Sequence, residues 1–179
     1  TPTGGVRGAG EEDAVFDVGD TVVYLTHGVG VVQRRESRQV GDRTQEFVVV
    51  EFPSRGMTVA VPMPEEGSIA LRPAMLPGEA EEVMQVLRMP AERIGATWSQ
   101  RVAKCQSRLK TGDPREAAAC VRDLADLDRS GRISYNEASV LGSARSNLAE
   151  ELSVTWGEQR VVVEQRIDDA LDGARAEAA

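Results

Sequence analysis

Cysteine and histidine are scarce in this chain of 179 residues, which has two cysteines and one histidine. Such a low count excludes a disulfide framework and a zinc site. Cys105 and Cys120 fall on two different predicted helices, and we expect both thiols to be buried and inert. His27 lies in a glycine-rich turn with no cysteine or serine nucleophile beside it, so we predict neither an enzymatic site nor a cofactor.

Long apolar runs and an excess of positive charge are also missing. The sequence contains no apolar run of roughly 18 residues and no apolar leader with a cleavage site, so we expect a cytoplasmic protein that does not enter a membrane. Its formal net charge of −8 argues against a protein that coats nucleic acid without specificity, because an acidic surface repels phosphate. A local basic patch can still override that average.

The first part of the chain has the pattern of short β-strands. Residues 16–32 combine β-branched side chains with two glycine turns, which predicts a strand, a turn and a strand. Further strands are predicted at 46–52 and 57–61, separated by Gly41-Asp42 and by a proline-glycine segment. Residues 16–77 are therefore predicted to form a small antiparallel β-barrel or strongly bent sheet.

Beyond Pro77 the hydrophobic residues recur every three or four positions, which is the period of an α-helix. Start and stop signals then divide this part of the chain into about five helices. The predicted helices are one that ends at Met89-Pro90, one from Thr97 to before Thr111, one over 114–127, one from the capping box of Ser134 and Glu137 to about Ser153, and one over 159–176.

The sequence thus predicts an α+β protein of two domains, a β domain at 16–77 and an all-α domain at 78–179. Residues 1–15 contain almost nothing apolar, and we predict a disordered tail there, because such a segment cannot bury enough surface to offset the entropy of ordering.

A basic window surrounds Trp98. Between Arg88 and Arg115 there are seven cations and two acids, a net charge of +5 in an otherwise acidic chain. Cations engage phosphates, and an aromatic ring stacks on bases or wedges between them, so the window is compatible with nucleic-acid binding. A core tryptophan with solvated arginines accounts for the same residues, because long charged side chains commonly cover helix surfaces.

A second pattern lies between the third and fourth predicted helices, where the sequence matches a calcium-binding loop. Its ligands would be Asp126, Asp128, Ser130, the carbonyl of Arg132 and a bidentate Glu137, with Gly131 at the sharp turn. Only one such loop occurs, although calcium-binding hands usually pair. A polar turn followed by the helix-capping box explains the same residues without a metal.

A series of short motifs runs from residue 16 to residue 151. It consists of residues 16–24, His27-Gly28, Thr58-Val59, Val61-Pro62, Leu71-Arg72, residues 85–88 followed by Pro90, Trp98-Ser99, Gly112-Asp113 and residues 121–124. In this order the motifs resemble the CarD/CdnL family of bacterial transcription regulators. The first domain of that family is shared with the polymerase-binding module of the transcription-repair coupling factor.

The resemblance implies a Tudor-like β domain that docks on the β subunit of RNA polymerase, and a helical domain that meets promoter DNA at the upstream edge of the transcription bubble. There the family's tryptophan wedges into the minor groove, a role that carries over onto Trp98. Arg101 matches a cation one helical turn later that would hold a phosphate. Lys104 and Arg108 are the further candidate DNA contacts on the same helix.

On the polymerase side, Arg38 matches a family arginine in the β domain. The segment that lies along the polymerase in the family corresponds to Met57, Thr58, Val59, Ala60 and Val61. An exposed edge strand at this place would extend a sheet of the polymerase. The implied partners are therefore the polymerase β subunit and promoter DNA, and we expect the chain to act as a monomer.

Several positions depart from the family pattern. Ala60 stands where the family usually has an arginine that helps to grip polymerase, Leu25 replaces a usual proline, and Gln100 and Ala103 replace basic residues near the tryptophan. Each lost charge is expected to weaken a contact, so the sequence also leaves room for an adaptor that binds another protein. A calcium-responsive interaction protein built on residues 126–137 is the remaining alternative.

Overall fold

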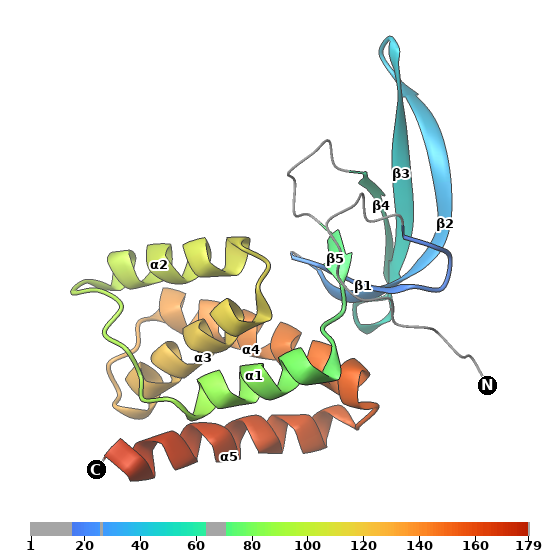
Figure 1. Cartoon of the computed structure of the whole chain (residues 1–179). Coiled ribbons are helices and arrows are strands. Elements are labelled where there is room, and N and C mark those ends of the chain that lie inside the picture. The colour runs from blue at the N-terminus through green and yellow to red at the C-terminus, as the bar shows by residue number, and fades with distance from the viewer. Residues whose placement is uncertain (1–15, 26, 64–70, 179) are drawn as a thin grey trace. The chain divides into compact units, whose positions relative to one another are not determined.

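The computed structural model describes residues 16–25, 27–63 and 71–178, with the backbone alone for 174–178. Within these residues the chain forms five β-strands followed by five α-helices (Figure 1). It divides into two compact units, Thr1–Ala74 and Met75–Ala179, which we call the β unit and the helical unit. The prediction of an α+β fold with two domains is confirmed. The predicted disordered tail at 1–15 lies outside the described residues.

The β unit is an antiparallel sheet with the strand order β4-β3-β2-β1-β5. Its strands are β1 (Thr21–Tyr24), β2 (Gly28–Val40), β3 (Arg43–Phe52), β4 (Met57–Pro62) and β5 (Leu71–Pro73), and a short 3-10 helix, Pro53–Arg55, joins β3 to β4. Strand β1 pairs with both β2 and β5, which leaves β4 and β5 at the two edges. One face buries a hydrophobic core of Phe16, Val22, Val32, Val48, Val50, Phe52, Val61 and Leu71.

Strands β2 and β3 are longer than the hydrophobic pattern predicted. The register between them shifts at Gln33, and beyond this bulge nearly every side chain of β2 is exposed. Gly41 and Asp42 form the two-residue turn that was predicted, with φ of 62° at Gly41 and Val40 paired with Arg43. The outer half of this hairpin is missed from sequence because it buries no face, so its side chains do not alternate in hydrophobicity.

The helical unit contains α1 (Pro77–Arg88), α2 (Trp98–Lys110), α3 (Pro114–Arg129), α4 (Tyr135–Trp156) and α5 (Arg160–Ala178). The predicted N-caps are confirmed, because the side chain of Thr97 accepts from the backbone of Gln100 and that of Ser134 accepts from the backbone of Glu137. Helix α4 runs past the predicted end near Ser153 to Trp156. It ends where Gly157 takes up the left-handed conformation, with φ of 64°.

Four of the helices supply the buried helical residues of the main core, and α2 contributes to it only through the partly buried Leu109. The core side chains come from α1, α3, α4 and α5, whereas α2 buries one side chain completely, Cys105. Cys105 belongs to a smaller cluster with Cys120 and Leu124 of α3. In Figure 1, α2 and α5 lie on opposite sides of the helical unit.

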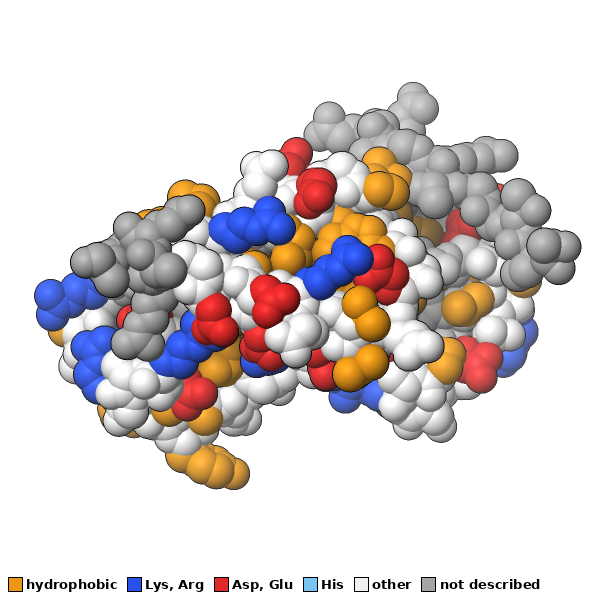
Figure 2. Space-filling view, turned by 90° about the horizontal axis from the view of Figure 1, so that it is seen from below, with side chains coloured by type: hydrophobic (Ala, Val, Ile, Leu, Met, Phe, Trp, Pro, Cys, Tyr) orange, Lys and Arg blue, Asp and Glu red, His pale blue; other side chains and the backbone are white. Residues whose placement is uncertain are grey.

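The side on which α5 lies has no dominant sign of charge. Figure 2 shows cationic and anionic side chains there, with hydrophobic side chains exposed between them. A groove between α1 and α5 repeats this mixture, since Arg88 and Arg166 line it together with Glu81 and Asp169. None of the helices within the described ranges is long and apolar enough to span a membrane.

Helix α2 is joined to α4 by a charged side chain that is completely buried. The side chain of Glu137 has no exposed surface, and its carboxylate accepts from Nε of Arg101 at 2.5 Å and from the backbone N–H of Ser134 at 2.8 Å. Burial raises the pKa of Glu137, but the hydrogen bonds from Arg101 and Ser134 outweigh it and hold that pKa below its ordinary value. The folded protein therefore favours the ionised carboxylate.

We predict that Glu137→Gln destabilises the helical unit by about 3 kcal/mol at pH 7, because it leaves the nearly buried guanidinium of Arg101 without a countercharge. A carboxylate with a lowered folded pKa stabilises the fold above its unfolded pKa of about 4.3, and this stabilisation is lost as the pH falls through the folded pKa. The difference between variant and parent should therefore shrink below about pH 4. Urea unfolding at pH 7 and in mild acid measures both quantities.

Glu164→Gln is the matched control, since Glu164 forms an exposed ion pair with Arg160 at 2.7 Å on α5. Its removal should change the unfolding free energy by less than about 0.5 kcal/mol. An equal cost for the two variants would contradict the role of the buried pair.

Candidate functional site

Trp98 is the first residue of α2 and is held in an exposed position. Its side chain is 50% exposed and belongs to neither hydrophobic core cluster of the helical unit. The capping box fixes the helix start, because Gln100 donates its backbone N–H to Thr97 at 3.3 Å and Oε1 of Gln100 accepts from the N–H of Thr97 at 3.2 Å. The core-tryptophan interpretation therefore does not describe this residue.

The loop that leads to Trp98 is anchored at three points. The N–H of Glu92 donates to Oδ1 of Asp123 at 2.8 Å, Ile94 packs against the small cluster around Cys105, and the carbonyl of Ala96 accepts from Arg101 at 3.3 Å. An indole at the start of a helix that is fixed in this way is presented without a large loss of entropy on binding.

Arg101, the expected phosphate contact, is turned inward. Its side chain is only 15% exposed, and the guanidinium is occupied by Glu137 and by the carbonyl of Ala96. This pairing could not be predicted from the sequence, because the acid that neutralises Arg101 lies on α4, far along the chain. In this structure Arg101 fixes α2 rather than offering a free cation.

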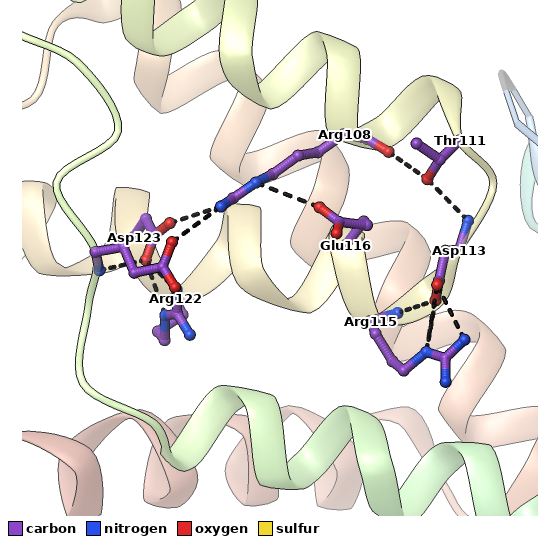
Figure 3. Close-up of polar contacts among 8 residues, drawn as sticks. Arg108, Thr111, Asp113, Arg115, Glu116, Arg122 and Asp123 are labelled. Atoms are coloured by element: carbon purple, nitrogen blue, oxygen red, sulfur yellow. Dashed lines mark hydrogen bonds and ion pairs between the residues drawn. The ribbon is translucent and has the colours of Figure 1, made fainter.

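Arg108 is likewise committed to the interior of the helical unit (Figure 3). Its guanidinium lies 2.8 Å from Asp123, 3.1 Å from Glu92 and 3.3 Å from Glu116, and its side chain is 13% exposed. Burial lowers the pKa of Arg108, but the hydrogen bond from Arg108 to Asp123 and the neighbouring carboxylates outweigh that effect and raise it. The arginine stays cationic and binds α2 to α3.

Asp123 is the centre of this second ion pair. It is fully buried, and its carboxylate accepts from Arg108, from Nε of Arg122 at 2.8 Å and from the N–H of Glu92. Sequence reasoning matched Arg122 and Asp123 to a family motif without assigning them a role. The available signal was an acid within the apolar stripe of α3, because a carboxylate at a core position requires partners.

The structure thus separates the seven cations of the basic window into two groups. Arg101, Arg108 and Arg115 form ion pairs with acids that lie mostly on other elements. The other four are exposed and form no ion pair with any described acid, and they are Arg88, Arg93, Lys104 and Lys110. Near Trp98 the free positive charge is therefore smaller than the window indicated, and it comes from Arg93 and Lys104.

The expected calcium ligands are not brought together as a cation site. Asp126 and Asp128 lie in the last turn of α3, and the Ser130 hydroxyl donates to the carbonyls of Asp126 and Leu127. Nη2 of Arg132 lies 3.8 Å from Asp126, and the carboxylate of Glu137 is occupied by Arg101 and Ser134. Among the described residues no cluster of three or more His, Cys, Asp or Glu side chains suits a metal. The capping box explains Ser134 and Glu137.

In the β unit, the segment expected to meet a protein partner is an edge strand. Strand β4 pairs with β3 on one side, and no other described strand pairs with its second side. Val59 and Val61 pack on the hydrophobic core, whereas Met57 and Thr58 are exposed and Ala60 is half-buried opposite Val49. The outer edge of β4 has the backbone groups that β-augmentation uses.

Arg38 lies on the outer half of the β2–β3 hairpin and not beside β4. It pairs across with Gln45, beyond the point where Pro62 ends the pairing of β4 with β3. Its guanidinium lies 5.0 Å from the centre of the Phe47 ring and forms an ion pair with Glu36, and the side chain is 52% exposed. Arg38 is thus oriented by its neighbours while remaining accessible to a partner.

Two domain models match the chain, one in each unit. The model of the CarD-like/TRCF RID domain matches residues 16–74, and that of the CarD C-terminal domain matches residues 82–168. The chain is also similar to YdeB of Bacillus subtilis (strain 168), a candidate transcription factor. The identity is 27% over 143 residues, which cover 80% of this chain and 94% of YdeB. With both domain models matched in order along one chain, the protein belongs to the CarD/CdnL family, as its motif series predicted.

Proposed function

We propose that the chain is a transcription regulator that binds the β subunit of bacterial RNA polymerase through its β unit and stabilises the open promoter complex through its helical unit. The match to the CarD-like/TRCF RID domain supports the polymerase partner, and the similarity to YdeB supports a role in transcription. The observation that carries the promoter contact is Trp98, a half-exposed indole on a helix held by two buried ion pairs.

The indole acts as a wedge at the upstream edge of the bubble. A side chain that inserts between base steps binds only DNA that is already opened or kinked, so it shifts the equilibrium from closed to open complex. If the open fork covers roughly 80 Å² of the exposed indole, at about 25 cal/mol per Å², the gain is about 2 kcal/mol, or roughly 30-fold in the equilibrium. No base sequence needs to be read for this effect.

Phosphate contacts beside the wedge come from the free cations. Lys104 follows Trp98 by six residues, about 9 Å along the axis of α2, and it is exposed without an acidic partner in the described structure. Arg101 and Arg108 support the contact indirectly, because they keep α2 on α3 and α4. The replacement of family cations by Gln100 and Ala103 leaves few phosphate contacts, which fits a protein that relies on polymerase for its position.

The β unit supplies that anchorage. The edge of β4 would extend a polymerase sheet through backbone hydrogen bonds, and Arg38 would add a charged contact from the hairpin. Ala60 provides no cation at the middle of β4, so Arg38 carries a larger share of the electrostatic contact than in relatives with an arginine there.

We predict that Trp98→Ala shortens the lifetime of open complexes by about 3- to 30-fold, because the wedge favours only the open state. The measurement is the decay of open complexes after a heparin challenge, with bacterial RNA polymerase and saturating protein. Binding to polymerase should not change. Tyr135→Ala is the matched control, since Tyr135 is 89% exposed at the same helical position of α4. A lifetime that is unchanged by Trp98→Ala would rule out the wedge.

We predict that Lys104→Ala weakens the promoter effect uniformly across promoter sequences. The slope of the logarithm of open-complex stability against the logarithm of salt concentration should fall by about one, the value for one lost phosphate contact. Its unfolding free energy should stay within about 0.5 kcal/mol of the parent. Arg108→Ala provides the contrast, because it should destabilise the helical unit by removing one of the two cations that neutralise the buried Asp123. An unchanged salt slope for Lys104→Ala would remove Lys104 from the interface.

We predict that Arg38→Ala weakens binding to a purified fragment of the polymerase β subunit by about tenfold, without unfolding the β unit, because its contacts are exposed. Arg34→Ala is the control, since Arg34 also pairs with Glu36, at 3.2 Å, and does not match the family arginine. Titration by calorimetry gives both affinities. Equal affinities for Arg38→Ala and the parent protein would place the electrostatic contact elsewhere.

A further inference from the structure

The two cysteines of the chain lie against each other in the folded protein. Cys105 is on α2 and Cys120 is on α3, both are completely buried, and they share one small cluster with Leu124. Within the described residues this cluster has only these three buried members, so the two thiols occupy one small enclosed region between α2 and α3. The sequence places them on different helices, so only the tertiary structure makes them a pair.

The two cysteines lie where α2 packs on α3. Cys105 is the one side chain that α2 buries completely, and α2 is the helix that carries Trp98. Both side chains are small, which lets the axes of α2 and α3 approach closely at this point. A disulfide has an S–S length of about 2.05 Å, so its formation requires the two helices to move closer at this point.

We propose that Cys105 and Cys120 are an oxidisable dithiol, and that a peroxide converts them into an intramolecular disulfide that ties α2 to α3. This inference does not rest on the proposed function, since it concerns only the thiols and the two helices that bear them. From the sequence we expected inert thiols, because the sequence does not show that the two cysteines meet in the fold.

The reaction balances with hydrogen peroxide as the oxidant. The thiolate of Cys105 attacks one peroxide oxygen and breaks the O–O bond, which gives a sulfenic acid and, with one proton, a molecule of water. The sulfur of Cys120 then attacks the sulfenic sulfur, and its proton leaves with the hydroxyl as a second water. Two thiols and one peroxide thus give one disulfide and two waters.

The surroundings favour Cys105 as the first nucleophile. The neighbouring thiol of Cys120 holds the pKa of Cys105 below its ordinary value, whereas the thiol of Cys105 and burial raise the pKa of Cys120. The charged groups nearby are Arg108, which favours a thiolate at position 105, and Asp123 and Glu137, which oppose it. The fold brings the two thiols together, and the difference between their pKa values determines which thiol attacks the peroxide first.

Access to the buried thiols requires α2 to open locally. Helix α2 is held by its two ion pairs, by the buried Cys105 and by the partly buried Leu109, and elements with few buried apolar contacts open at a lower free energy than the core. Peroxide is small, so a brief opening of α2 is sufficient. Oxidation should therefore be slow in the folded protein and limited by this opening.

The test treats the full-length protein with millimolar hydrogen peroxide, quenches the reaction, and alkylates the remaining thiols after unfolding. We expect a loss of about 2 Da in intact mass. Trypsin cleaves after Lys104, Arg108, Arg115 and Arg122, so the disulfide should join peptide 105–108 to peptide 116–122. Closing a loop of about 15 residues should raise the melting temperature of the oxidised protein by roughly 5–10 °C, and dithiothreitol should reverse the shift.

Two variants sharpen the result. Cys120→Ala should give no linked peptide and should instead accumulate sulfenic or sulfinic acid at Cys105. Glu137→Gln, which weakens the attachment of α2, should speed formation of the disulfide at least severalfold. The proposal is overturned if both thiols of the parent protein remain alkylatable, if oxidation stops at sulfinic acid, or if only disulfide-linked dimers form.

Discussion

Two buried carboxylates fix α2, the helix that bears Trp98. Glu137 of α4 neutralises Arg101, and Asp123 of α3 neutralises Arg108, so α2 is held by charge at two points and by a single fully buried side chain between them. Buried ion pairs add little stability relative to a hydrophobic contact, but breaking one is costly because it leaves a charge without a partner. Such pairs specify one position for α2 more strongly than they stabilise it.

This arrangement explains why Trp98 is available. Helix α2 buries little apolar surface, Cys105 completely and Leu109 in part, and its ion pairs do not require its first residue to be buried. The same ion pairs neutralise Arg101 and Arg108, which the sequence indicated as DNA contacts. Among the described residues, the cations without an ion pair that lie closest to Trp98 in the sequence are Arg93 and Lys104. A surface with few free cations and one fixed aromatic side chain suits a protein that is delivered to promoter DNA by another contact. The proposed anchorage of the β unit on polymerase provides that delivery.

In the β unit, the hydrophobic core and the exposed outer hairpin occupy different parts of the sheet. Its core is confined to one part of the sheet, and beyond the bulge at Gln33 the β2–β3 hairpin continues without burying a face. Backbone hydrogen bonds and cross-strand pairs such as Arg35 with Glu46, at 3.0 Å, support this outer part. Within the described residues the outer hairpin buries no core side chain, and the outer edge of β4 pairs with no other strand, although Val59 and Val61 of β4 pack on the core.

Local sequence signals were enough to predict the two-domain α+β fold, the turn at Gly41-Asp42 and the capped starts of α2 and α4, and the motif series singled out Trp98 as a candidate. Each of these depends on local backbone chemistry, on hydrophobic periodicity or on a recognisable motif series. Only the tertiary structure decided which charges are free. The acids that neutralise Arg101 and Arg108, and the thiol that meets Cys105, lie on other helices, and no spacing along the chain reports which helices pack together. The capping box that resembled a calcium loop shows the same limit, because Glu137 binds an arginine that is 36 residues away.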